Sequence, residues 1–224
     1  MSHQRFVHLN VHTEYSIVDS TIRIPQLIKN IKDMGMAAVA ITDVNNLFAT
    51  IKFFNAAKKA GVKPIVGADV LVESSEDPDV TWELTLLCQN EAGYRNLSIL
   101  LSKAQNNVNK YSIPCVTADM VKEHNEGLIA LADTLHSDVG YWIQSQKLEQ
   151  AVDCLLAWRG VFGDRYYLAV AHIERENESQ INAAAMYMAA HQGIPMVASG
   201  RVRFLEDDDF NAHEARICIN RGDV

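Results

Sequence analysis

The sequence is poor in the features that mark secreted, membrane and metal-ribbon proteins. Its four cysteines, Cys88, Cys115, Cys154 and Cys218, are far apart and form no CxxC pair. Neither a zinc ribbon nor a disulfide framework is therefore indicated, and we expect small buried side chains. No apolar run reaches the ~20 residues of a membrane span, and no signal-peptide-like stretch opens the chain. We expect a cytoplasmic protein.

Basic residues are also scarce. The chain has 20 Lys and Arg against 28 Asp and Glu, which gives a formal net charge of −8. A surface that holds nucleic-acid phosphates needs clustered cations. Lys58 and Lys59 form a local exception, and DNA contact through them would weaken steeply with added salt. We expect no direct DNA contact by this chain.

Segments whose apolar residues have the spacing of a strand alternate along the chain with segments that have the spacing of a helix. Short apolar or alternating runs predict strands, and runs with helical spacing that end at glycines predict helices. The expected strands are 6–12, 37–42, 64–72, 81–88, 127–131, 165–171 and 194–199, and the helices between and after them are 24–34, 47–60, 91–104, 118–124, 146–158, 176–192 and 210–220. This order predicts one barrel-like α/β domain over residues 1–224, with its site at the carboxyl ends of the strands.

The stretch Phe6–Ser16 combines the alternating apolar and polar pattern of a strand with two closely spaced histidines. Along a strand, His8, Asn10 and His12 would share one face. Histidines at alternate positions can converge on a metal ion at about 2.0–2.1 Å per nitrogen. Asn10 is a poor ligand at the middle position, so a half-buried strand with hydrogen-bonded histidines is the simpler interpretation.

Five separated motifs together resemble one known family. They are Phe6–Ser16, Ile41–Asp43, Lys63–Asp69, Gly93–Leu97 and Phe210–Glu214. In this order they resemble the N-terminal polymerase and histidinol phosphatase (PHP) domain of bacterial DNA polymerase III α subunits, over essentially the whole chain. The resemblance implies a distorted seven-stranded (β/α)7 barrel. In metal-binding members, its cleft holds up to three cations and hydrolyses phosphoesters with a metal-bound hydroxide.

The resemblance also implies which residues occupy the ligand positions of that cleft. His12, Asp19 and Asp69 keep the ligand character of the family. At other positions the ligand is lost, most clearly where the closing Asp-x-His falls on Arg201 and Arg203. The implied vestigial cleft comprises Asn10, His12, Asp19, Asp43, Val44, Asp69, Glu83, Thr134, Arg201 and Arg203.

Two arginines in place of a carboxylate and an imidazole suggest how such a cleft would stay neutral. Guanidinium groups remain protonated and repel bound cations. We hypothesise that Arg201 and Arg203 replace the metal ions by pairing with Asp19, Asp69, Asp43 or Glu83; the alternative is that they are surface side chains. We expect no cofactor in this domain. If one metal ion were bound (Zn, Mn or Mg), His12, Asp19 and Asp69 would hold it.

The function implied is that of a platform without catalytic residues of its own. The chain would be a fragment of a longer DNA-directed DNA polymerase, a nucleotidyltransferase whose Mg-binding palm domain is absent here. Its partners would be the proofreading exonuclease subunit, the other polymerase domains and the replisome. The alternative is a residual metal-dependent phosphoesterase, a pyrophosphatase or a 3′–5′ exonuclease, that uses His12, Asp19, Asp43 and Asp69. His172 is expected to lie on the surface or to support the site from behind, and His213 is expected to pack or to cap a backbone segment and not to catalyse.

Overall fold

The computed structural model describes residues 6–17, 19–74, 76 and 80–221. The chain divides into two compact units. Unit 1 contains residues 1–68 and 201–224, and unit 2 contains residues 69–200. That residues 1–224 form a single domain stays a prediction.

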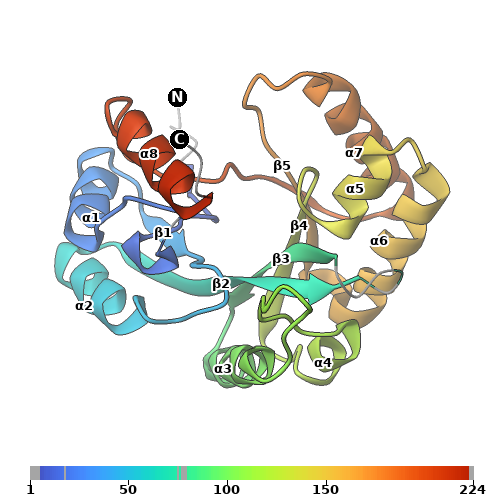
Figure 1. Ribbon diagram of the computed structural model, residues 1–224, viewed down its shortest axis with the longest axis horizontal. Coiled ribbons are helices and arrows are strands. Elements are labelled where there is room, and N and C mark those ends of the chain that lie inside the picture. Colours follow the sequence, from blue (N-terminus) through green and yellow to red (C-terminus); the bar gives the residue numbers. More distant parts are fainter. Residues whose placement is uncertain (1–5, 18, 75, 77–79, 222–224) are drawn as a thin grey trace. The chain divides into compact units, whose positions relative to one another are not determined.

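Unit 1 is built on two parallel strands and their helices (Figure 1). Strand β1 (Ala38–Ile41) pairs with the first part of β2 (Lys63–Glu73), in a register that runs from Ala38 opposite Lys63 to Ile41 opposite Val66. The helical elements are η1 (Glu14–Ser16), α1 (Ile24–Asp33), α2 (Thr50–Ala60) and α8 (Asp209–Arg221). β1 and β2 lie where the sequence predicted strands.

The core of unit 1 follows from the spacing of apolar residues along α1. Ile24, Leu27, Ile28 and Ile31 recur at helical intervals, and all four are buried. They pack in one cluster with Phe53 and Ala57 of α2 and with Val39 and Ile41 of β1. α2 ends at Gly61, which adopts a left-handed conformation with φ of 77° that glycine accepts without strain.

The strand predicted over residues 6–12 is not formed as a regular strand. Backbone bonds join Ala40 N to His8 O and Thr42 N to Val11 O, so a step of three residues in this segment faces a step of two residues at the end of β1. The chain bends at Leu9, and the segment keeps a single parallel bridge, Val11 to Val202. Because the extra residue interrupts the pleat, the predicted alternation is wrong: Asn10, Val11 and His12 are buried in succession.

Unit 2 carries the rest of the sheet. Its strands are the second part of β2, β3 (Thr81–Cys88), β4 (Leu128–Asp133), β5 (Tyr166–Val170) and β6 (Met196–Ala198). β3 and β4 are antiparallel, whereas β4, β5 and β6 are parallel. The strand order from β1 to β6 follows the chain. The protein is thus an α/β protein in which the described residues form six strands, one fewer than predicted.

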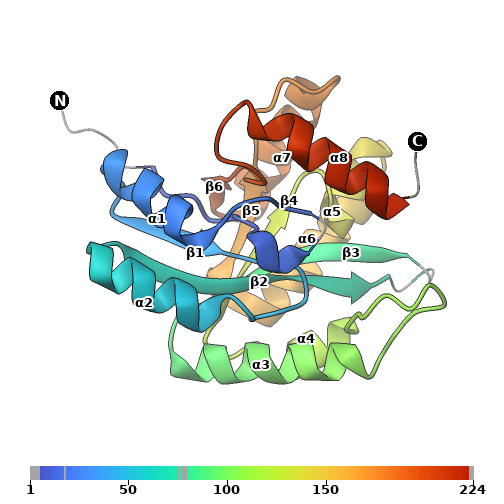
Figure 2. The ribbon, with the colours of Figure 1, turned by 60° about the vertical axis from the view of Figure 1, so that its left-hand side comes forward.

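Helices cover the strands of unit 2 in two groups. α3 (Glu91–Gln105) packs on β3 and β4 and lies beside α4 (Ala118–Glu123) (Figure 2). The Lys103–Glu123 ion pair links these two helices. The other group comprises α5 (Asp138–Gln144), α6 (Leu148–Phe162), the turn η2 (Gly163–Arg165) and α7 (Glu178–Gln192). The sequence did not predict α5, whose seven residues give too little periodicity. No helix in the described ranges has the length and apolar character needed to cross a membrane.

Candidate functional site

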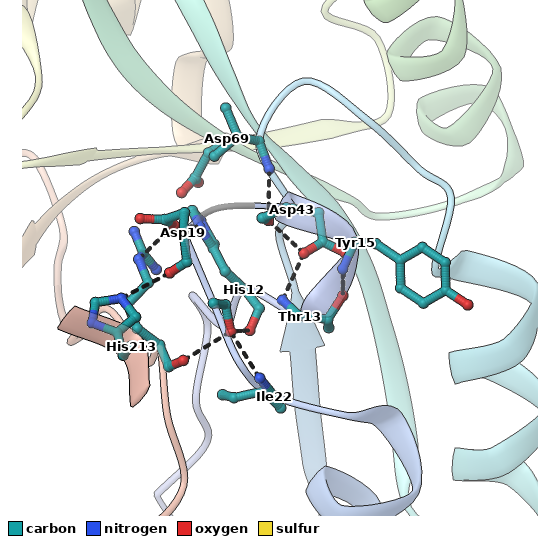
Figure 3. Close-up of polar contacts among 12 residues, drawn as sticks. His12, Thr13, Tyr15, Asp19, Ile22, Asp43, Asp69 and His213 are labelled. Carbon is teal, nitrogen blue, oxygen red and sulfur yellow. Dashed lines mark hydrogen bonds and ion pairs between the residues drawn. The ribbon is translucent and has the colours of Figure 1, made fainter. Parts of the chain in front are cut away.

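Asp19 is the centre of a charged cluster in unit 1 (Figure 3). One carboxylate oxygen, Oδ2, contacts both His12 Nδ1 and Arg203 Nε, the latter at 2.7 Å. The side chain of His12 is fully buried and that of Arg203 is 12% exposed, whereas Asp19 is 39% exposed. An ion pair between Asp19 and one of the two predicted arginines is therefore present.

The pKa of Asp19 reflects these neighbours. Desolvation alone would raise the pKa of this carboxyl, but the hydrogen bond with His12 and the positive charge of Arg203 outweigh it. The charge of Arg201 acts in the same direction. The pKa is therefore held below its ordinary value, and Asp19 is ionised at neutral pH.

The turn that carries Asp19 is fixed from three sides. Ser20 Oγ lies 2.7 Å from His12 O and 2.8 Å from Arg203 O, so one hydroxyl spans both backbone segments. From α8, His213 Nε2 lies 3.0 Å from Asp19 O, and Arg216 donates to Ser20 O at 2.9 Å. His213, which was predicted to pack or cap, thus contacts the backbone of this turn. His213 and Arg216 are nearly 200 residues away in sequence from Asp19 and Ser20, which they contact.

Asp43 follows β1, and its carboxylate accepts hydrogen bonds from the first segment of the chain. Its two oxygens accept from Thr13 N at 2.6 Å, Thr13 Oγ1 at 2.8 Å and Ser16 Oγ at 2.6 Å. Thr13 also caps η1 by accepting from Tyr15 N. Asp43 is 2% exposed, so its carboxylate holds the 13–16 turn on the end of β1.

The other residues of the implied cleft are divided between the two units. Unit 1 also contains Asn10 and Val44, together with Arg201, whose charge acts on Asp19. In unit 2, buried Asp69 accepts from Thr85 Oγ1 at 2.5 Å, Thr134 Oγ1 lies 3.5 Å from Asn182 Oδ1, and Glu83 lines a cavity. That these ten residues form one vestigial cleft stays a prediction. His172 lies on the surface, as expected, with its side chain 84% exposed.

The donor set of unit 1 does not fit a metal ion. A cation at Asp19 would meet a guanidinium 2.7 Å from the same carboxylate, and at Asp43 it would have to displace three donors. Neither unit, in the residues that the structure describes, brings together three His, Cys, Asp or Glu side chains that could hold a metal. In unit 1 the arrangement neutralises buried charge and fixes a turn.

Sequence reasoning missed Arg216 and the roles of Thr13, Ser16 and Ser20. Thr13 and Ser16 lie within the first motif, and a Thr such as Thr13 directly before a short helical turn is a signal for a cap, whereas Ser16 is the last residue of η1 and gives no such signal. The partners of Ser20 and Arg216 depend on contacts between distant segments, for which the sequence carries no local signal.

Comparisons with known proteins agree with this architecture. A family model described as the PHP domain matches residues 8–172. The chain therefore belongs to the PHP domain family.

Among the curated proteins that this chain is similar to are DNA polymerase III α subunits. The DNA polymerase III subunit alpha of Xylella fastidiosa (strain Temecula1) is 41% identical over 237 residues, which cover 99% of this chain and 20% of the relative. The subunit of the same name from Escherichia coli K12 is 39% identical over 222 residues, or 99% of this chain and 19% of the relative. The chain spans about a fifth of the length of these relatives.

Solved structures share the fold at low sequence identity. A Bifidobacterium adolescentis protein assigned as a metal-dependent phosphoesterase matches with a TM-score of 0.56 and 15% identity, over 94% of this chain and 95% of its own. An amidohydrolase from Chromobacterium violaceum matches with a TM-score of 0.56 and 12% identity, over 94% and 96%. At these identities the likeness establishes the fold and carries no function.

Proposed function

We propose that this chain is a PHP domain without catalytic activity of its own, from the α subunit of a replicative DNA polymerase III. The observation that carries the proposal is the position of Arg203 Nε, 2.7 Å from Asp19 Oδ2. A fixed guanidinium at this carboxylate provides the neutralising charge that a metal ion would otherwise supply. The DNA-directed polymerase activity would belong to the full-length protein, as the identity of about 40% to α subunits supports.

The predicted seven-stranded barrel is part of this proposal. Residues 8–12 bond to β1 on one side and to Val202 on the other, which is the place of a strand in a sheet. In the proposed barrel this bent segment takes the position of the seventh strand.

Metal analysis tests the absence of catalytic cations. We expect the full chain, purified from cells grown with added zinc or manganese, to hold well below one metal ion per chain. Because a guanidinium already neutralises the carboxylate of Asp19, we also expect hydrolysis of a generic phosphodiester at the same background rate for the unaltered chain and for His12→Ala. A metal-binding PHP phosphoesterase, assayed in parallel, is the positive control. Stoichiometric metal together with activity that His12→Ala abolishes would favour the residual phosphoesterase instead.

We further propose that the domain binds the proofreading exonuclease subunit and braces the remaining polymerase domains. An acidic chain of net charge −8 with few clustered cations is compatible with a protein partner and poorly suited to DNA. Since no metal would mediate the contact, titration calorimetry should give saturable binding of the exonuclease subunit that is the same with and without EDTA. A DNA oligonucleotide should give no comparable heat. Absence of binding to the purified subunit, or binding that EDTA abolishes, would contradict this role.

A further inference from the structure

Unit 2 contains a cavity of about 250 Å³ whose walls come mainly from β3, α5 and α6. All three tryptophans of the chain, Trp82, Trp142 and Trp158, line it, and we call it the tryptophan cavity. Its volume is below the roughly 300–1,000 Å³ of pockets for drug-sized ligands. It therefore suits a small group, such as the end of one side chain.

Trp82 and Trp142, which both line the tryptophan cavity, pack against the ring of Tyr141. Trp82 lies 4.7 Å from Tyr141 between ring centroids with the rings tilted by 34°, and Tyr141 meets Trp142 edge-on at 4.9 Å. Lys147 Nζ lies 4.9 Å from the centroid of the Trp142 ring. Indole faces attract cations through the quadrupole of the ring, and this unit already places one cation against a tryptophan of the wall.

Among the described residues that line the tryptophan cavity, every charged side chain is acidic. These residues are Glu73, Glu76, Glu83, Asp138 and Asp153. Acidic groups of one sign around a low-dielectric hollow focus a negative potential in it. Combined with the aromatic wall, this charge selects for a cation and against a neutral or anionic ligand.

Among the acidic residues of the tryptophan cavity, Asp138 has a carboxylate that is bonded to neutral donors in a buried position. Its carboxylate accepts from Trp158 Nε1 at 2.8 Å, from Val139 N at 2.7 Å and from the thiol of Cys154. Burial raises the pKa of Asp138, and it raises that of Cys154 to about 12, so the thiol stays protonated as a donor. These donors are all neutral, so none of them brings a positive charge to the carboxylate. A buried carboxylate with neutral partners alone gains when a cation enters.

We propose that the tryptophan cavity binds the guanidinium or ammonium group of a basic ligand, with Asp138 as its counter-charge and the indole rings as its walls. This inference is independent of the proposed platform function. The same chemistry could come from a free organic cation or from an arginine or lysine side chain of a protein segment, and a binding experiment separates the two.

Intrinsic fluorescence is a direct readout, because all three tryptophans line the cavity. We expect L-arginine amide, titrated into the full chain at constant ionic strength, to change the emission saturably. L-citrulline amide, a neutral ligand of nearly the same shape, should give no saturable change. The peptide acetyl-Gly-Arg-Gly-amide is the second arm: tighter binding than the free amide assigns the site to a protein side chain, and weaker binding assigns it to a free cation.

Two substitutions and a control test the counter-charge. Asp138→Asn keeps the size of the side chain and should weaken arginine-amide binding about tenfold. Should that variant fail to fold, Asp153→Asn, on the exposed surface of α6, should weaken it about threefold. Asp164→Asn removes an exposed acidic residue of the same unit that does not line the cavity, and should leave binding unchanged. Equal responses to arginine and citrulline amides, or no saturable response to either arginine ligand, would overturn the proposal.

Discussion

Replacing Asp19 by Asn is expected to lower the free energy of unfolding by about 2–3 kcal/mol. The carboxylate is shared by His12 and Arg203, and their side chains are 0% and 12% exposed. Removal of one partner from a buried pair leaves the other charge without compensation, which typically costs about 3–5 kcal/mol. The partial exposure of Asp19 reduces this cost because water screens part of the interaction. Chemical denaturation followed by far-UV circular dichroism measures the change.

A matched surface pair provides the control for this prediction. Asp33, at the end of α1, lies 3.9 Å from Lys29 with its side chain 64% exposed. Because exposed pairs contribute little, Asp33→Asn should change stability by less than about 0.5 kcal/mol. In the double variant Asp19→Asn with Arg203→Met, the losses should fall short of their sum by about 1 kcal/mol or more. Additive losses would show that Asp19 and Arg203 do not stabilise each other.

The loss of stability caused by Asp19→Asn should depend on pH. The pKa of Asp19 lies below its ordinary value of 3.8 in the folded protein, so the folded state takes up this proton less readily than the unfolded chain. The stability that Asp19 provides is then fully present above about pH 3.8 and is lost as the pH falls through the lowered pKa. The difference between the unaltered chain and Asp19→Asn should therefore shrink below that pH. A difference that grows with acidification would contradict the ion-pair explanation.

The sequence predicts most elements of this fold because their apolar periodicity is local. β1 and α1 lie within one residue of the predicted bounds, since a buried run and a helical face can each be recognised from neighbouring positions. The first strand fails because the extra residue near Leu9 is a property of its pairing with β1. α5 fails because it spans only seven residues, although Ser137 caps it as a sequence signal would suggest.

The candidate site shows the same division between local pattern and distant contact. The family resemblance identified Asp19 and Arg203, and the charges of the residues were enough to suggest their pairing. It gave no indication that Asp43 would be occupied by Thr13 and Ser16, which are 27 to 30 residues away. The bonds from α8 to the Asp19 turn form only after distant segments meet, so no local pattern encodes them.

A second large effect is expected at Gly93, the first residue of the Gly93–Leu97 motif. This glycine lies in the first turn of α3, where its N–H donates to the cap residue Asn90 at 3.0 Å. A Cβ on Gly93 would lie 1.9 Å from the carbonyl oxygen of Gly127 and 2.6 Å from its carbon. The obstacle is backbone and cannot rotate away, so α3 would have to shift on the sheet and weaken its cap. Gly93→Ala should destabilise unit 2 by at least about 3 kcal/mol.

Gly160 is the matched control, because it also lies in a helix of unit 2 but a Cβ at this position would have nothing within 4 Å. At Gly160, alanine reduces the freedom of the unfolded chain and meets no obstacle, so Gly160→Ala should stabilise by about 0.5–1 kcal/mol. Denaturation followed by tryptophan fluorescence suits both variants, since Trp82, Trp142 and Trp158 all belong to unit 2. If both substitutions shift the transition in the same direction, helix propensity rather than the contact with Gly127 would explain the glycine of this motif.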